Sequence, residues 1–482
     1  MIASHNRQRG ELVVRLAAID SGKLAAGDAR AYGTMRRTLG RELDSLLPPA
    51  AAPVAQAPWP PDCQYDVARI AGVTRGLDSL RNRLYACYGW AQSHVVADRD
   101  TLDRLSVLAS LGTAADEDRR RRLFLALAPV WRSVNRDNGP ESPYRRLIAM
   151  ESRDRRESRV ADQARASGVS PDSLEPWLLA ILAAWRDANP EPRVEPWNWF
   201  YANGGTSRAL SSRIPLDRLT RLNARVYRSL GADPERLRVR YDLAPREGKT
   251  PVAYTTFGYR PRWINGSWRA GEPWIFATYR AGGLDNLNEL LHETGHAIHI
   301  AAIRTRPAFA DWPDSDPFTE ALADLIALDV YEPSWQQRWL GDSVPLAVGL
   351  RSRYGGIVMD VAWAVFELRM LRRPAADPNQ TWADLTSNYL GISPHPELSW
   401  WAMRGQLIDA PGYMMNYAVG AMLSAAIRAR TRALHGPADS TWYGWIAPRL
   451  YRFGLARPAR VVVEEFLGGP VTPEALLRDM RR

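Results

Sequence analysis

The chain has 482 residues, enough for one large core or for about two to three domain-sized units. Hydrophobic residues make up 46% of it and charged residues 24%, a globular composition that excludes disorder as the default. The formal net charge of +10 could attract nucleic acid, but the basic runs at residues 119–122 and 153–159 adjoin acidic residues at helical spacing, and no nucleic-acid motif accompanies them. No apolar run approaches the roughly 18 residues of a membrane span. We therefore expect a soluble protein that neither binds nucleic acid nor inserts into a membrane.

The N-terminal part is expected to be a separate helical segment. Residues 5–47 have the pattern of two helices, so we assign residues 1–47 to this segment and the Pro- and Ala-rich residues 48–62 to an extended connector. Arg15 interrupts the first apolar stretch, so no secretory signal is visible, which favours the cytoplasm. Residues 63–482 are expected to form a single domain made of two helical lobes.

The next part of the chain, to about residue 187, has a helical pattern almost throughout. The two cysteines of the chain, Cys63 and Cys87, belong to this part. A disulfide between them would stabilise the fold by roughly 3 kcal/mol and would imply an oxidising compartment outside the cytoplasm. Two reduced thiols in the core are an equally good interpretation.

The first β pattern lies between residues 251 and 280. The segments PVAYTTFGY (residues 251–259) and EPWIFATYR (residues 272–280) are rich in aromatic and β-branched residues, and the pair Asn265–Gly266 between them is typical of a tight turn. We expect a small antiparallel sheet. Its exposed edge could bind an extended peptide through main-chain hydrogen bonds, or it could be an ordinary structural hairpin. The candidate substrate-binding residues are Ala253, Tyr254 and Thr255.

A helix expected over residues 285–300 carries the clearest chemistry. His292 and His296 are four positions apart, so on a helix they share one face and can bind a single metal ion through two imidazoles. Such a pair suits zinc, which lowers the pKa of a bound water to about 7. Glu293, next to the first histidine, is placed to take a proton from that water as a general base. We therefore predict one Zn²⁺ per chain at this helix.

A third ligand is expected because catalytic zinc usually has three protein ligands and an open fourth position for water or substrate. Residues 317–328 (PFTEALADLIAL) form a second apolar helical segment, in which Glu320 supplies a carboxylate. Asp324 lies one turn further on the same face and can accept the N–H of a ligating histidine. The sequence thus predicts a site of two histidines and one glutamate, with an aspartate behind them.

Two other residues of the first helix have expected structural roles. Gly295 is a poor helix former, and we expect it where another backbone or a substrate approaches closely. His299 shares the face of the two ligands, but a fourth protein ligand would close the site. We therefore expect His299 to be a hydrogen-bonded residue of the helix.

These motifs resemble those of the gluzincin metallopeptidases, specifically the angiotensin-converting-enzyme-like and the oligoendopeptidase F/thimet oligopeptidase-like families. HETGHAIH, residues 292–299, is similar to the oligopeptidase form HEFGHALH. FTEALADLIALDV, residues 318–330, is similar to the converting-enzyme form, in which the glutamate ligand lies in a pattern like HEAxxD. The spacing from His296 to Glu320 is also that of the converting-enzyme-like family. The resemblance implies a zinc peptidase whose helical lobes cover an active-site channel.

A second region resembles the converting-enzyme-like family. WADLTSNYLGISP, residues 382–394, is similar to a segment with a Gly-Ile-x-Pro turn, and APGYMMNYAVG, residues 410–420, to the tyrosine-bearing element that faces the zinc. By this resemblance Tyr417 donates its hydroxyl to the oxyanion, and Tyr413 contacts substrate or shares that role. Two tyrosines at helical spacing could also simply pack. Both families carry a histidine shortly before these tyrosines, whereas residues 406–409 read QLID here, so the resemblance does not specify the substrate.

The sequence therefore predicts a mainly α, two-lobed metallopeptidase with a deep central cleft and a small antiparallel sheet next to the zinc helix, its zinc-site core spanning about residues 250–430. The predicted activity is zinc-dependent hydrolysis of short peptides, by an oligopeptidase or a peptidyl-dipeptidase, since a deep channel would exclude folded proteins. Two alternatives are a zinc-binding pseudopeptidase that acts in recognition and a zinc hydrolase of a non-peptide amide metabolite. The sequence does not specify the oligomeric state.

Overall fold

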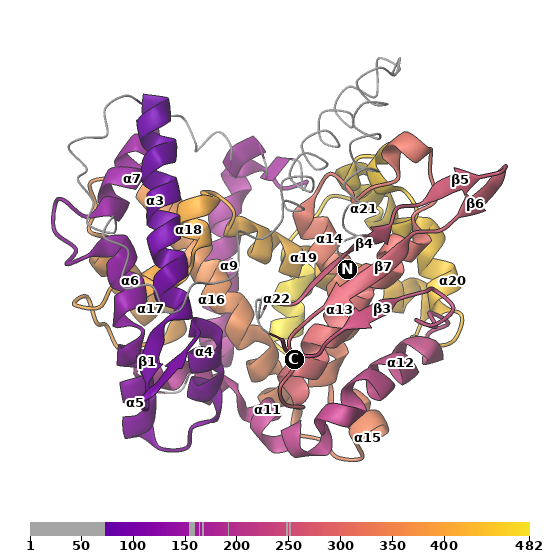
Figure 1. Cartoon of the computed structure of the whole chain (residues 1–482), viewed down its shortest axis with the longest axis horizontal. Helices are drawn as coiled ribbons and strands as arrows, with labels where there is room; N and C mark the ends of the chain where they lie inside the picture. The colour runs from indigo at the N-terminus through magenta and orange to yellow at the C-terminus, as the bar shows by residue number, and fades with distance from the viewer. Residues whose placement is uncertain are drawn as a thin grey trace.

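The computed structural model describes residues 73–482, except residues 154–159, 163, 166–167, 191, 247–248 and 250–251. The predicted N-terminal helical segment and the Pro/Ala connector lie outside the described residues. The described chain is mainly helical, with small sheets beside the helices (Figure 1).

The α-helices follow one another along the whole described chain. Their bounds are α3 Val73–Ser93, α4 Arg104–Thr113, α5 Glu117–Ala126, α6 Ala128–Asn135, α7 Pro143–Arg153, α9 Pro171–Ala188, α10 Trp199–Asn203, α11 Gly205–Leu210, α12 Leu219–Ser229, α13 Leu284–Ala302, α14 Asp316–Ala327, α15 Pro333–Leu340, α16 Leu346–Arg372, α17 Pro378–Leu390, α18 Gln406–Asp409, α19 Met415–His435, α20 Trp442–Ile446, α21 Ala459–Leu467 and α22 Glu474–Met480.

Short helical turns and strands connect these helices. The turns are η4 Pro196–Asn198, η5 Ser211–Arg213, η6 Leu216–Arg218, η7 Pro307–Phe309, η8 Leu328–Tyr331, η9 Trp400–Met403, η10 Ala447–Tyr451 and η11 Gly454–Ala456. The strands are β1 Val95–Ala97, β2 Asp100–Leu102, β3 Arg240–Asp242, β4 Tyr254–Tyr259, β5 Arg262–Ile264, β6 Ser267–Arg269 and β7 Glu272–Phe276. The sequence did not predict the hairpin of β1 and β2, which lies within the part that we expected to be helical.

The chain forms two lobes, and consecutive segments of it belong first to one lobe and then to the other (Figure 1). The first lobe contains α3 to α7, and the second contains α12 to α15 with the strands β3 to β7. The long helix α16 then returns to the first lobe, where it contacts α7, α9 and α17, and α19 leads back to the second lobe, where it contacts α14. One continuous set of buried hydrophobic side chains extends through both lobes, from Leu77 to Met480. The two lobes therefore share a core.

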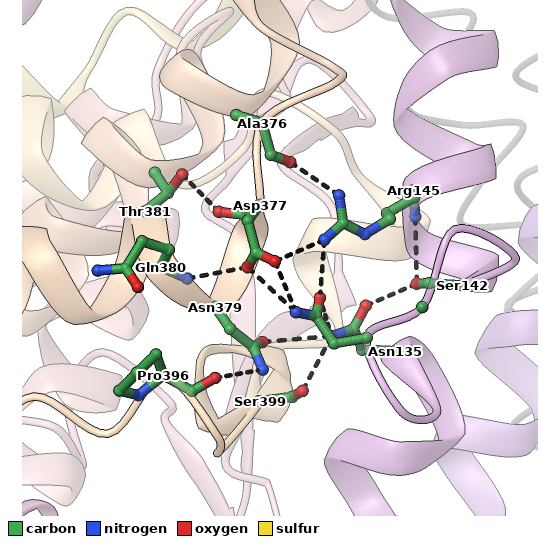
Figure 2. A network of polar contacts seen from close by, with 12 residues as sticks. Asn135, Ser142, Arg145, Ala376, Asp377, Asn379, Gln380, Thr381, Pro396 and Ser399 are labelled. Atoms are coloured by element: carbon green, nitrogen blue, oxygen red, sulfur yellow. Dashed lines mark hydrogen bonds and ion pairs between the residues drawn. The ribbon is translucent and has the colours of Figure 1, made fainter.

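A polar network joins α6 and α7 to the beginning of α17 (Figure 2). Asn135 donates to Asn379 at 3.3 Å and to Ser399 at 2.9 Å. Arg145 donates to Asp377 at 2.8 Å, and Asp377 also caps α17 by accepting from the backbone N–H of Gln380. Asn135 and Arg145 lie more than 200 residues before their partners in sequence, so the network fixes how the chain returns to the first lobe.

The sheet beside α13 has the strand order β3-β7-β4. Strands β4 and β7 pair antiparallel, as predicted, but β3 pairs parallel with β7, so the sheet is mixed rather than purely antiparallel. The predicted turn at Asn265 and Gly266 is present, and their positive φ angles of 49° and 74° are those of a tight hairpin turn. This turn joins β5 to β6, an antiparallel extension that lies between β4 and β7 in the chain.

None of the described helices is both long enough and apolar enough to cross a membrane. Cys87 is buried in α3 and is disulfide-bonded, whereas Cys63 lies outside the described residues.

Candidate metal centre

Helices α13 and α14 meet at Gly295 without any intervening side chain. A Cβ atom at Gly295 would lie 2.5 Å from the carbonyl oxygen of Ala323 and 2.7 Å from its Cα atom, distances that real Cβ atoms do not show. This is the close backbone approach that the sequence predicted. Because Ala323 precedes Asp324, the contact brings the polar face of α14 against the histidines of α13.

Three side chains converge at this contact. The Nε2 atom of His292 lies 3.2 Å from one carboxylate oxygen of Glu320, and the Nε2 atom of His296 lies 3.6 Å from the other. The candidate ligand atoms of the three residues all lie within 4.8 Å of one another. Ligands of a tetrahedral zinc ion, at bond lengths of about 2.0–2.1 Å, are separated by about 3.3 Å. The residues present therefore fit a zinc ion in number, in chemistry and in spacing.

The three candidate ligands differ in their exposure to solvent. The side chain of His296 is 9% exposed and that of His292 is 21% exposed, whereas that of Glu320 is 45% exposed. Glu320 is therefore the ligand that solvent reaches most readily.

Asp324 lies behind His292, where the sequence placed it. One of its carboxylate oxygens is 2.8 Å from Nδ1 of His292, which leaves Nε2 of that ring directed at Glu320. Burial opposes protonation of His292, but the hydrogen bonds to Asp324 and Glu320 outweigh it and raise the pKa of this histidine well above its ordinary range. Partial desolvation opposes ionisation of Glu320, but His296 and His292 outweigh it and hold its pKa well below the ordinary value. The negative field of the two carboxylates thus attracts a cation to this point.

Glu293, the candidate general base, is buried beside the first strand of the predicted sheet. Its carboxylate lies 2.6 Å from the hydroxyl of Thr255, which also lies 2.9 Å from the backbone carbonyl of Glu293. From the sequence we expected Thr255 to contact the substrate and did not predict its contact with Glu293. The residue spacing within a strand or a helix does not indicate which residues of the two elements meet. The contact fixes the direction of the Glu293 carboxylate.

The other two candidate substrate-binding residues lie next to Thr255. Ala253 precedes β4, and Tyr254 begins it. The ring of Tyr254 stacks on Phe276 with centroids 5.0 Å apart, and the residue is 43% exposed. Among the described strands, β4 is at the end of its sheet and pairs only with β7. The second edge of β4 thus has no partner among the described strands. A free edge of this kind is what an extended peptide needs in order to bind by main-chain hydrogen bonds.

Helix α19 brings Tyr417 toward the same point. It packs against α14, where a Cβ atom at Gly420 would lie 3.9 Å from that of Glu320. Tyr417 lies one turn before Gly420 on the same face, and its phenol interacts electrostatically with Glu320. Tyr413 lies before the first residue of α19, so the two tyrosines are not one turn apart on a single helix as expected. The ring of Tyr413 still contacts that of Tyr417 edge to face, with centroids 5.7 Å apart.

The segment that precedes the two tyrosines supplies a partner for Tyr417. Gln406 donates from its amide nitrogen to the phenol oxygen of Tyr417 at 3.2 Å, and the guanidinium of Arg404 lies 5.6 Å from the ring. Burial raises the pKa of Tyr417. The phenol thus keeps its proton at neutral pH and can donate it in a hydrogen bond. The nearest preceding histidine, His395, is engaged elsewhere by Glu195 at 2.7 Å and Glu397 at 2.6 Å.

A cavity of about 320 Å³ lies between α4, α10, α16 and η9. Asp285, at the beginning of α13, and Arg404 are among the residues that line it. Arg404 also lies over the ring of Tyr417, but none of the candidate metal ligands lines this cavity.

The expectation for His299 is wrong. Neither of its ring nitrogens has a hydrogen-bond partner among the described residues. The ring instead lies between those of Trp312 and Tyr451, with centroids 5.4 Å and 5.2 Å away. Burial, with a smaller effect of the nearby His296, lowers the pKa of His299 to about 3. His299 is therefore a neutral aromatic residue of the core beside the candidate metal centre.

No protein-family model and no curated protein matches the sequence. Solved structures match nearly the whole chain. A protein assigned as oligoendopeptidase F has 14% sequence identity and a TM-score of 0.59, and the match covers 98% of this chain and 84% of that one. PZ peptidase A, solved with an inhibitor, has 14% identity and a TM-score of 0.55, and the match covers 99% of this chain and 84% of that one.

A carboxypeptidase of the M32 type from Deinococcus radiodurans R1 has 14% identity and a TM-score of 0.50, with 99% of this chain and 96% of that one covered. At such low identity these matches show a shared fold. The mainly helical fold that the sequence predicted is therefore confirmed. The chain resembles in its fold the oligoendopeptidase F group that its motifs had indicated.

Proposed function

We propose that this chain is a zinc-dependent peptidase that hydrolyses peptide bonds in short peptides. The observation that carries the proposal is the convergence of His292, His296 and Glu320 at the contact of α13 with α14. Asp324 supports this group from behind. The fold that the chain shares with an oligoendopeptidase F and PZ peptidase A gives independent support.

The metal ligands are His292 and His296, through their Nε2 atoms, and the carboxylate of Glu320. A bound zinc ion supplies Lewis acidity and makes hydroxide available near neutral pH. Asp324 accepts the Nδ1 proton of His292, which holds the ring in the tautomer that leaves Nε2 free for the metal.

Glu293 acts as the general base. Its carboxylate takes a proton from the attacking water and later delivers it to the nitrogen of the leaving amine, so that one water is consumed for each peptide bond broken. The hydroxyl of Thr255 holds this carboxylate in position. Thr255 thus positions Glu293 and does not itself contact the substrate.

Tyr417 donates a hydrogen bond to the negative oxygen that forms on the scissile carbonyl carbon. Because its phenol oxygen accepts a hydrogen bond from Gln406, the single proton of the phenol is left for the substrate. Tyr413, whose ring contacts that of Tyr417, binds the substrate beside the scissile bond.

The substrate is a peptide in an extended conformation. The free edge of β4, which begins at Tyr254, offers main-chain hydrogen bonds to such a peptide and so requires little of its side chains. Because His292 and His296 are largely buried, a short flexible peptide fits better than a folded protein. The products are those of an oligopeptidase or a peptidyl-dipeptidase.

The proposal is tested by incubating the zinc-loaded protein with a mixed oligopeptide library and identifying the products by mass spectrometry. We expect cleavage by the wild type and none by Glu293→Gln, which keeps the three ligands and removes the base. Glu272→Gln is the matched control, because Glu272 pairs with Arg238 at 3.0 Å on β7. Intact peptides with one zinc bound would contradict the proposal and support a role in recognition. Cleavage of a non-peptide amide alone would contradict it in favour of a metabolite hydrolase.

A further inference from the structure

A second cavity, of about 580 Å³, lies on the other side of α14 from the candidate metal centre. Successive residues of a helix are about 100° apart, so Leu325 and Ile326, which line this cavity, point away from the face that carries Glu320 and Asp324. No residue assigned to metal or substrate binding lines the cavity. It is therefore separate from the proposed active site.

One wall of the cavity is aromatic. Trp335 and Trp339 come from α15, with ring centroids 6.4 Å apart, and Trp442 comes from α20. Leu230, Leu325 and Ile326 are among the other apolar residues that line it. Small-molecule sites have volumes of about 300–1,000 Å³ and are lined mostly by apolar and aromatic side chains with a few polar groups. The volume of this cavity lies within that range, and its lining combines apolar and aromatic side chains with an equally large set of polar and charged ones.

Two of the arginines that line the cavity are neutralised within the protein. Arg428 is buried and donates to Asp329 and to the backbone carbonyl of Leu325. Arg482 donates from both terminal nitrogens to Glu332, at 2.8 Å each. Asp329 and Glu332 are the acidic residues that line the cavity, and both are used in these pairs.

Two further arginines leave the cavity with an excess of positive charge. Arg432 lies 3.6 Å from Asp329, whose same oxygen already accepts from Arg428. Arg338 has no carboxylate partner among the described residues, and its guanidinium lies 5.1 Å from the centre of the Trp339 ring. Both side chains are exposed at the surface. With four arginines against two acids, the cavity presents two guanidinium groups that a ligand can neutralise.

We propose that this cavity binds a small organic anion with a flat apolar body, such as an aromatic carboxylate. Its acidic group lies between Arg338 and Arg432, because guanidinium groups bind carboxylates with paired hydrogen bonds and give up their hydration readily. Its flat body lies against Trp339, which is half-buried, whereas Trp335 and Trp442 are buried behind it. One or two negative charges match the two guanidinium groups that have no full partner, which distinguishes this ligand from a highly charged polyphosphate.

A pair of fluorescent probes tests the proposal on the zinc-loaded full chain. The anion 1-anilinonaphthalene-8-sulfonate and the uncharged N-phenyl-1-naphthylamine share the same ring body and differ in the sulfonate. We expect the anion to bind with a saturable 1:1 stoichiometry and at least tenfold more tightly than the neutral probe. Indole-3-acetate, an aromatic carboxylate, should displace it.

The variant Arg338→Gln with Arg432→Gln should lower the affinity for the anionic probe at least tenfold and leave that for the neutral probe unchanged. Arg449→Gln is the matched control, because Arg449 is also exposed and lies 4.6 Å from the ring of Trp445, outside the cavity. Both substituted residues of the cavity are exposed, so the variant should fold, which far-UV circular dichroism verifies. Equal binding of the anionic probe to wild type and double variant, or equal affinity of the wild type for the two probes, would overturn the proposal. Peptidase activity plays no part in the readout, so this outcome is independent of the proposed function.

Discussion

The hydroxyl of Thr255 lies 2.6 Å from the carboxylate of Glu293, the proposed general base. A hydrogen bond to a charged group contributes about 1.5–3 kcal/mol, and here it also sets the direction of the carboxylate. We expect Thr255→Val, which keeps the shape of the side chain, to lower kcat/KM about tenfold to hundredfold without loss of zinc. Thr256→Val is the control, because successive residues of a strand point to opposite faces. Peptide kinetics with metal analysis check this, and unchanged activity of Thr255→Val would refute it.

Substitution of the two tyrosines, one at a time, distinguishes transition-state stabilisation from substrate binding. Tyr417→Phe removes a hydrogen bond made only as the oxyanion forms, so we expect kcat to fall about 10²- to 10³-fold with little change in KM. Tyr413→Phe should instead raise KM and leave kcat near that of the wild type. Steady-state kinetics on one fluorogenic peptide distinguish the two. The assignment fails if Tyr417→Phe changes only KM.

At the scale of single residues, the sequence predicted what depends on helical periodicity. The shared face of His292 and His296 follows from their spacing, and the structure brings both to Glu320. Contacts between elements were not predictable in this way. Thr255 lies on a strand far from Glu293 in the chain, and no motif predicts the contact of Gln406 with Tyr417.

The contact of α13 with α14 depends on the absence of a side chain at Gly295. A Cβ atom there would lie 2.5 Å from a backbone oxygen of α14, so Gly295→Ala must push the two helices apart. We expect a loss of about 1–3 kcal/mol in the free energy of unfolding, together with weaker zinc binding because Glu320 moves away from the histidines. Urea unfolding and metal titration measure the two effects.

Gly356→Ala is the matched control for Gly295→Ala. Gly356 lies within α16, and a Cβ atom there meets nothing within 4 Å. The same substitution should therefore be neutral or should stabilise by about 0.4–1 kcal/mol, since alanine restricts the unfolded chain. If both variants behaved alike, backbone entropy and not the helix contact would explain the result at Gly295.

The loop that carries Tyr413 is held by a buried carboxylate of α16. Glu367 accepts hydrogen bonds from the backbone N–H groups of Gly412, at 2.7 Å, and Met414, at 3.4 Å. Burial raises the pKa of Glu367 to about 8 from an ordinary value of 4.5. The folded protein thus retains a proton that the unfolded chain loses, so its stability should decrease as the pH rises from 4.5 toward 8.

The loss that Glu367 causes has a maximum slope of about 1.4 kcal/mol per pH unit. We expect Glu367→Gln, which cannot ionise, to reduce the dependence of the urea midpoint on pH between pH 5 and 9. Glu117→Gln is the control, since hydrogen bonds from Asn198 and Trp197 lower the pKa of Glu117 and it stays ionised over that range. Parallel pH profiles of wild type and Glu367→Gln would show that Glu367 does not titrate in this interval.

At the scale of elements, long helices with strong patterns were predictable and short strands were not. The helices α13 and α14 lie within a few residues of their expected bounds, because apolar periodicity defines them. Strand β3 has only three residues, Arg240–Asp242, and no apolar alternation. It forms because β7 offers it a free edge, which only the tertiary structure provides.

For the whole molecule, the sequence predicted two helical lobes but not which segments of the chain belong to each lobe. Helix α16 is buried along most of its length, so it lacks the amphipathic pattern that would indicate its neighbours. Its contacts with α7, α9, α17 and α19 place it at the centre of the molecule. The motif resemblance covered only part of the chain, whereas the shared fold covers almost all of it at 14% identity.

Zinc should stabilise the molecule as a whole, because its ligands come from two helices that belong to the continuous core. A ligand that binds only the folded state at about 1,000 times its Kd adds about 4 kcal/mol to the free energy of unfolding. We expect chelator treatment to lower the Tm by several degrees and zinc, but not magnesium, to restore it. Glu320→Gln should abolish most of this shift, whereas Asp342→Asn, which alters an exposed carboxylate paired with Arg213, should retain it. Differential scanning calorimetry provides the measurement, and an equal zinc shift in both variants would mean that the metal binds elsewhere.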